Sequence, residues 1–194
     1  MEIKLKVIDI LERNKDGIHL RMLAEKAGSS FPNVRRYANI LEKEGVVKKE
    51  KMRNMVVVKL KKSQKTLAYL KMVHTERFQS LPAKAMTGTT DLLDGLGNKP
   101  LIMAIFGSYA KGNFNPKSDL DILLVYQKIG SSEDVENTSR KISMRTGLRI
   151  NPVYLDYAGF EKRMIERNPG IMKEIGRDSI ILVGIEYYYS LWWE

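Results

Sequence analysis

Two aspartates separated by one residue give the clearest chemical signal of the sequence. Asp119 and Asp121 open an apolar run that is typical of a β-strand, in which residues two apart point to the same face of a sheet. Two neighbouring carboxylates repel each other unless a cation compensates their charge. Mg²⁺ binds carboxylate oxygens together with the phosphates of a substrate. The pair therefore predicts a magnesium site beside a phosphate-bearing molecule.

A short segment upstream contains residue types that bind phosphate. Residues 101–106 form a continuous apolar run, typical of a buried strand, and Gly107 and Ser108 follow it directly. Glycine lets the backbone approach a phosphate closely, and serine adds a hydroxyl donor beside exposed N–H groups. Lys111 adds a positive charge to the same loop, and Ser118 immediately precedes the aspartate pair. The loop therefore predicts a phosphate-binding site.

Together the two segments resemble the DNA polymerase beta-like nucleotidyltransferases, in particular the minimal, kanamycin-type branch. The resemblance rests on residues 106–112 and 118–125 and extends over about residues 98–185. It implies transfer of a nucleoside monophosphate from a nucleoside triphosphate to an acceptor hydroxyl, with release of pyrophosphate. It also implies that Gly107 and Ser108 hold the terminal phosphates, and that two Mg²⁺ ions bound by the aspartates stabilise the attacking and leaving oxygens. The nucleotide-binding residues that the resemblance implies are Gly107, Ser108, Lys111 and Ser118.

One position departs from the pattern of this family, which supplies a third carboxylate from a later strand. Residues 148–155 are predicted to form that strand, and Asn151 occupies the matching position. Asparagine offers a carbonyl oxygen but neither charge nor a base. We expect Asp156 to cap the next helix and Pro152 to confine the strand to an edge or an irregular position. Two interpretations remain: nucleotidyl transfer with two acids, or nucleotide binding without turnover.

Most of the formal net charge of +10 lies in the first third of the chain. Residues 1–62 hold 16 Lys and Arg against 8 Asp and Glu, whereas the remaining residues hold 17 and 15. A basic segment joined to a nearly neutral one predicts a polyanion-binding module. The alternative is a solvated surface rich in Lys and Glu, as in heat-adapted proteins.

Apolar spacing in this basic segment predicts three helices, over residues 3–14, 19–27 and 30–44, followed by two short strands at 46–51 and 55–61. The pattern resembles the winged helix-turn-helix family, which implies that the third helix enters the major groove of DNA and that the hairpin contacts the flanking backbone. A winged helix used only for protein contacts is the alternative. The candidate DNA-binding residues are Asn33, Arg35, Arg36, Asn39 and Lys43 on the helix and Lys48, Lys49, Lys51 and Arg53 on the hairpin.

The chain therefore predicts an α+β protein with three parts. A winged helix-turn-helix domain covers residues 1–62, a helical connector covers 63–97, and a mixed sheet with flanking helices covers 98–194. Within the last part we predict a helix over residues 132–146, with Val135, Ile142 and Met144 on its apolar side. Five large aromatic residues end the chain, and we expect them to pack on their own core or on a partner subunit of a homodimer; stacking on bases is the alternative.

Composition excludes several classes of protein. The 194 residues include no cysteine, which excludes disulfides and a thiolate zinc site. Charges interrupt the N-terminal apolar stretch and the longest apolar run is far shorter than a membrane span, so we expect a cytoplasmic protein without a membrane partner. The competing functional hypothesis is a DNA-binding transcriptional regulator, of toxin–antitoxin type, whose second domain binds a nucleotide or a protein partner without full catalysis.

Overall fold

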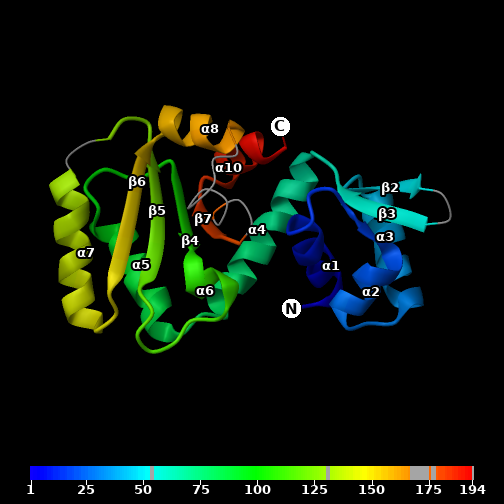
Figure 1. Ribbon diagram of the computed structural model, residues 1–194, viewed down its shortest axis with the longest axis horizontal. Helices are drawn as coiled ribbons and strands as arrows, with labels where there is room; N and C mark the ends of the chain where they lie inside the picture. Colours follow the sequence, from blue (N-terminus) through cyan, green and yellow to red (C-terminus); the bar gives the residue numbers. More distant parts are fainter. Residues whose placement is uncertain (53–54, 130–131, 167–174, 176–177, 194) are drawn as a thin grey trace. The chain divides into compact units, whose positions relative to one another are not determined.

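The computed structural model describes residues 1–52, 55–129, 132–166, 175 and 178–193 (Figure 1). These residues combine helices with two sheets, which confirms the predicted α+β class. The chain divides into two compact units, Met1–Glu76 and Arg77–Glu194. The division falls inside α4 (Gln64–Gln79), within the stretch where the sequence suggests a connector. No helix of the described ranges is both long and apolar enough to span a membrane.

The first unit consists of helices beside a three-stranded antiparallel sheet of order β1-β3-β2. Its core is the apolar stripe of each helix, with Val7, Leu23 and Val34 fully buried. Besides the first part of α4, its elements are α1 (Ile3–Glu12), β1 (Ile18–His19), α2 (Leu20–Ala27), α3 (Phe31–Lys43), β2 (Val47–Met52) and β3 (Met55–Leu60).

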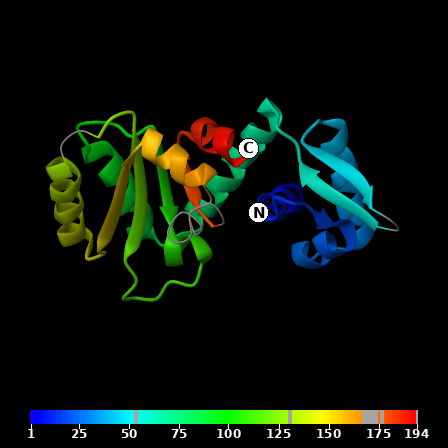
Figure 2. The ribbon, with the colours of Figure 1, turned by 45° about the horizontal axis from the view of Figure 1, so that its top comes forward.

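β2 and β3 form an antiparallel hairpin (Figure 2). Strand alternation places its charged side chains on two different faces. Lys49 pairs with Val58 and Lys51 with Val56, so these four side chains share one face. Lys48 lies on the other face, and its ammonium is 2.8 Å from a carboxylate oxygen of Glu50. The lysines that the sequence groups together therefore point in two directions.

A polar network joins α1, the end of α3 and α4 within the first unit. Lys4 donates to Oε1 of Glu44 at 2.9 Å, the Tyr69 hydroxyl donates to Oε2 at 2.8 Å, and Lys4 also contacts Tyr69. The hydrogen bond from Lys4 holds the pKa of Glu44 below its usual value of 4.5, against the opposing effect of partial burial, and Tyr69 adds to it. The ionised form of Glu44 therefore stabilises the folded unit.

The second unit is built on a four-stranded mixed sheet of order β6-β5-β4-β7, in which only β5 and β6 are parallel. β6 lies at the edge, as Pro152 predicts, because proline cannot donate to a neighbouring strand. Besides the end of α4, the described elements are α5 (Ala83–Gly95), β4 (Ile102–Phe106), α6 (Gly107–Lys111), β5 (Leu120–Tyr126), α7 (Ser132–Thr146), β6 (Ile150–Asp156), α8 (Tyr157–Ile165), β7 (Ile180–Val183) and α10 (Ile185–Trp192).

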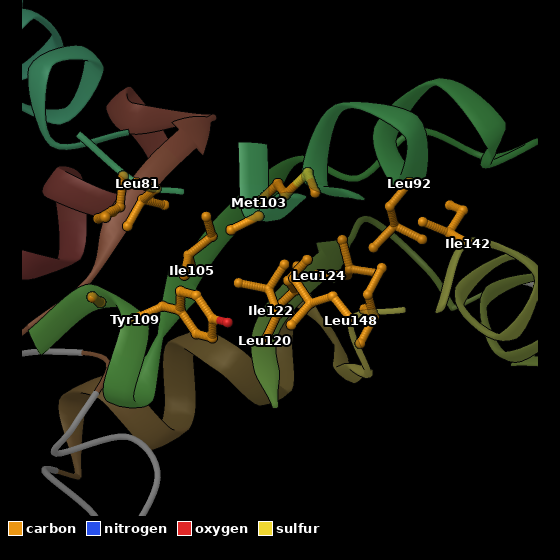
Figure 3. Packing of buried hydrophobic residues seen from close by; sticks show 14 of the residues in the cluster. Leu81, Leu92, Met103, Ile105, Tyr109, Leu120, Ile122, Leu124, Ile142 and Leu148 are labelled. Atoms are coloured by element: carbon orange, nitrogen blue, oxygen red, sulfur yellow. The ribbon is translucent and has the colours of Figure 1, made fainter. Parts of the chain in front are cut away.

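Helices cover both faces of this sheet. One face packs against α5 and α7, where Met103, Ile122 and Leu124 meet Leu92 and Ile142 (Figure 3). This packing leaves the opposite face of β5, with Asp121, free of the apolar cluster, since successive residues of a strand alternate.

Aromatic residues pack together beneath α8 and α10 in the same unit. Tyr188 and Tyr189 are buried, their rings 5.2 Å apart, and Tyr188 also lies 6.3 Å from Phe160 of α8. The Tyr188 hydroxyl donates to the carbonyl of Ile175 at 2.7 Å. These two tyrosines of the aromatic tail therefore belong to the core of their own unit, whereas Tyr187 is exposed.

Candidate nucleotide-binding site

The pairing of β4 with β5 brings Gly107 against Asp121. Phe106, the last residue of β4, pairs with Asp121, and Gly107 follows it as the first residue of α6. The φ angle of Gly107 is +70°, and a β-carbon there would collide with Oδ2 of Asp121. Glycine is therefore required both for the backbone conformation and for the space that the carboxylate fills.

The parallel pairing of β5 with β6 places Asn151 directly opposite Asp121. The Asn151 amide Nδ2 donates to Oδ1 of Asp121 at 2.8 Å. In this geometry the amide nitrogen, and not the carbonyl oxygen, faces the carboxylate. Asn151 can present its oxygen to a cation shared with Asp121 only if the amide turns over.

An arginine that the sequence analysis missed lies beside the other aspartate. Nε of Arg149 is 3.6 Å from Oδ2 of Asp119, and the Arg149 carbonyl accepts a hydrogen bond from Leu120 at 2.8 Å. Both side chains are accessible to solvent. The signal that could have found it is alternation, because Arg149 precedes Asn151 by two residues and so shares its face, as Asp119 does with Asp121.

These side chains fit a divalent cation. Oxygen ligands are what Mg²⁺ prefers, and the two carboxylates at the start of β5, opposite the end of β4, supply them at a position that solvent can reach. The described part of the chain contains no group of three or more His, Cys, Asp and Glu side chains arranged to hold a metal. A cation bound here takes its protein charge from Asp119 and Asp121 alone, and the rest of its ligands come from water or substrate phosphates.

Tyr109 anchors α6 next to the carboxylates. Its side chain extends toward Leu120 and Ile122, and its ring stacks on Phe114 with centroids 4.5 Å apart (Figure 3). Burial raises the pKa of the Tyr109 hydroxyl, and the negative charge of Asp119 raises it further. Tyr109 therefore remains neutral at physiological pH, so it adds no charge to the site.

Comparison with protein-family models yields a match in this part of the chain. Residues 93–182 match the family Polymerase beta, Nucleotidyltransferase. This match confirms the nucleotidyltransferase resemblance expected from the Gly-Ser and Asp-x-Asp segments, and its range includes Gly107, Asp119, Asp121 and Asn151. Comparison with curated proteins and with solved structures finds no match.

Two further residues proposed for the nucleotidyltransferase site lie in and after α6. Lys111 is the last residue of α6 and is exposed. Ser118 closes the loop before Asp119, since its hydroxyl accepts a hydrogen bond from the backbone N–H of Asn115 at 2.9 Å. The nucleotide-binding roles of Gly107, Ser108, Lys111 and Ser118 remain predictions.

The candidate DNA-binding residues of α3 lie mainly on its exposed side. Arg35, Arg36, Asn39 and Lys43 are exposed, whereas Asn33 is half-buried. The Asn33 amide donates to the Ser29 hydroxyl at 2.9 Å, and its oxygen accepts from Arg36 at 3.1 Å. Asn33 therefore helps to order the start of the helix, and the other four residues form the accessible face.

One hairpin lysine is bonded to α3, and two others are exposed. Lys49 donates to Asn39 at 2.7 Å and lies 2.7 Å from Glu42, so it fastens the hairpin to α3. Lys48 is exposed and paired with Glu50, and Lys51 is exposed on the face of Lys49. Arg53 lies outside the described residues.

Proposed function

We propose that the chain is a magnesium-dependent nucleotidyltransferase that also binds duplex DNA through its N-terminal unit. The observation that carries the first part is the contact of Gly107 with Asp121, two residues from Asp119, inside the range that matches the nucleotidyltransferase family. The substrate is a nucleoside triphosphate, and the acceptor is a hydroxyl group.

Different residues around Gly107 bind the metal ion and the phosphates. Asp119 and Asp121 would hold Mg²⁺, which would neutralise charge on the triphosphate during transfer. Backbone N–H groups at Gly107 and the Ser108 hydroxyl hold the terminal phosphates. The acceptor oxygen then bonds to the α-phosphorus, the bond from that phosphorus to the bridging oxygen breaks, and pyrophosphate leaves with the electron pair. The acceptor proton passes to water, since Asn151 cannot accept it.

The hydrogen bond between Asn151 and Asp121 favours a second candidate function. A neutral amide at this position supplies neither negative charge for a second metal ion nor a base for the acceptor hydroxyl. The alternative is therefore a DNA-binding regulator, of toxin–antitoxin type, whose second unit binds a nucleotide or a protein partner without turnover.

Charge and shape support DNA binding by the first unit. Three helices are followed by an antiparallel hairpin, as in a winged helix, and α3 presents Arg35, Arg36 and Lys43 on its exposed side. Arg and Asn side chains recognise base edges, while Lys contacts phosphate. The excess of eight positive charges over residues 1–62 supplies the attraction to the DNA backbone.

An incorporation assay separates the two functions. The purified chain is incubated with Mg²⁺, cell extract and each of the four α-³²P-labelled nucleoside triphosphates, and the products are treated with protease or nuclease. We expect one triphosphate to label an acceptor, and we expect Asp119→Asn to abolish the label. Nucleotide binding without label supports the regulator. Neither binding nor label contradicts the nucleotidyltransferase and leaves only a regulator whose second unit binds a protein partner.

A further inference from the structure

The accessible face of the first unit is not purely polar. Phe31, the first residue of α3, is 39% exposed, and Met55 and Val56 of β3 are 50% and 37% exposed. A surface that contacts only phosphates has no use for exposed apolar side chains. Grouped apolar side chains on a charged face instead indicate a ligand with apolar groups of its own.

These side chains line two neighbouring hollows. The outer hollow, of about 430 Å³, lies along the outer side of α3 and is lined by Phe31, Pro32, Arg35, Arg36, Asn39, Ile40 and Lys43. The hairpin hollow, of about 670 Å³, lies between α3 and the hairpin and is lined by His19, Leu20, Arg21, Phe31, Arg35, Asn39, Lys49, Met55 and Val56. Phe31, Arg35 and Asn39 belong to both, because residues four apart form one row along a helix.

The lining of both hollows is positively charged. It contains Arg21, Arg35, Arg36, Lys43 and Lys49, and no Asp or Glu is among the residues that line either hollow. The occupant is therefore an anion that also presents apolar groups. Duplex DNA meets both conditions in its major groove, where phosphates flank the base edges and thymine presents a methyl group.

We propose that Phe31 recognises the thymine methyl group, so that the first unit prefers sequences rich in thymine. This inference rests on the proposed DNA binding. The N-terminal residues of a recognition helix reach base edges, and Phe31 occupies the first position of α3. Met55 and Val56 add further apolar lining to the hairpin hollow, and Arg35 adds a cation to the same lining.

The experiment compares two duplexes that differ only in that methyl group. Full-length chain is titrated with 24-base-pair duplexes of alternating dA and dT, or of alternating dA and dU, at several salt concentrations. We expect the thymine duplex to bind at least about fourfold more tightly, the value for one buried methyl group. In Phe31→Ala the two duplexes bind equally, while the dependence on salt stays as in the wild type because no charge is lost.

Four further variants make the test specific. Met72→Ala removes an apolar side chain of 51% exposure from α4, outside both hollows, and keeps the preference. Arg35→Ala weakens binding to both duplexes. Phe31→Leu, an apolar replacement, keeps part of the preference for thymine, whereas Phe31→Gln loses it. If Phe31→Ala melts at a lower temperature than the wild type, this pair shows whether the preference depends on the apolar side chain or on the stability of the fold.

The possible failures have different meanings. No binding of either duplex overturns the proposed DNA binding together with this inference. Equal binding of the two duplexes by the wild type, or an unchanged preference in Phe31→Ala, overturns the thymine inference and leaves DNA binding in place. If Phe31→Ala instead converts a dimer into a monomer in light scattering with its preference unchanged, the face is a protein interface and the inference is wrong.

Discussion

At the scale of single residues, the two carboxylates of the candidate nucleotide-binding site each have a partner from β6 or the residue before it. Asn151 donates to Asp121, and Arg149 lies beside Asp119. Carboxylates that lie close together are tolerated when hydrogen bonds or cations compensate them. The site's own side chains therefore compensate part of the carboxylate charge, and any bound metal ion competes with them.

The variant Asn151→Asp tests what the amide contributes. It replaces a hydrogen-bond donor by a third negative charge beside Asp121, so we expect a lower melting temperature in EDTA, by about 2–4 °C for a loss of about 1 kcal/mol. Mg²⁺ should restore the melting temperature of this variant to that of the wild type and raise its nucleotide incorporation. Differential scanning fluorimetry and the labelling assay measure the two effects.

The matched control for this variant is Asn151→Ala, which loses the hydrogen bond without adding charge. Its melting temperature should fall, and Mg²⁺ should not restore it. If Mg²⁺ acts equally on both variants, position 151 does not face the metal.

Removal of Arg149 should strengthen Mg²⁺ binding. Arg149→Ala eliminates a cation that competes for Asp119, and exposed ion pairs of this kind are worth less than about 1 kcal/mol, so we expect up to about fivefold tighter binding. Isothermal titration calorimetry with MgCl₂ at low ionic strength measures it. The control Arg145→Ala removes the same charge from an ion pair with Asp91, and an equal gain there would show that net charge alone is responsible.

At the scale of elements, α8 depends on a single cap. Asp156 accepts a hydrogen bond from the backbone N–H of Gly159 at 2.8 Å, which confirms the capping role expected from the sequence. Asp156→Ala should cost about 1 kcal/mol of unfolding free energy in urea denaturation. Asp156→Asn retains a good capping residue and should cost far less; an equal loss would mean that charge, and not the cap, stabilises the helix.

The network of Lys4, Glu44 and Tyr69 makes the first unit sensitive to acid. Because the pKa of Glu44 is lower in the folded chain, its contribution is complete above about pH 4.5 and is lost as the pH falls through the folded pKa. Glu44→Gln should therefore lower the melting temperature at pH 7 and show a smaller difference from the wild type at pH 3.5. Circular dichroism at several pH values measures this, with Glu25→Gln, on the exposed side of α2, as the control that should match the wild type throughout.

Most elements were predictable from their apolar spacing, and the exceptions have physical causes. The helix expected over residues 132–146 coincides with α7, but Met144 is exposed, because it lies two positions from Ile142 and so on another side of the helix. The strand β1 was not predicted, since so short a strand has no periodicity: Ile18 lay between two predicted helices and His19 was the first residue of the second. Ser30 occupies the N-cap position of α3, but its side chain makes no cap hydrogen bond.

The candidate site was predictable only in part. The Gly-Ser and Asp-x-Asp segments indicate its residues directly, because their types and spacing are local properties. The contact of Asn151 with Asp121 and the approach of Arg149 to Asp119 depend on the parallel register of β5 and β6, which brings together residues 30 apart in the chain. Sequence spacing alone does not define that register.

At the scale of the whole molecule, the two units differ in the charges that they present. The first unit combines cations with exposed apolar residues on α3 and the hairpin, as expected of a surface that binds nucleic acid. The informative charges of the second unit are two acids beside a glycine. Net charge of the chain therefore indicates a partner for the first unit and gives no information on the chemistry of the second.

The most direct test is calorimetric titration of the full chain with non-hydrolysable analogues of the four nucleoside triphosphates, in Mg²⁺ and in EDTA. We expect at least one analogue to bind in Mg²⁺ and to bind at least about tenfold more weakly in EDTA or to Asp121→Asn, while Asp94→Asn, an exposed acid of α5, behaves as the wild type. Absence of binding would contradict a nucleotide site built on Asp119 and Asp121. So would an affinity that is the same for the wild type in Mg²⁺, the wild type in EDTA and Asp121→Asn.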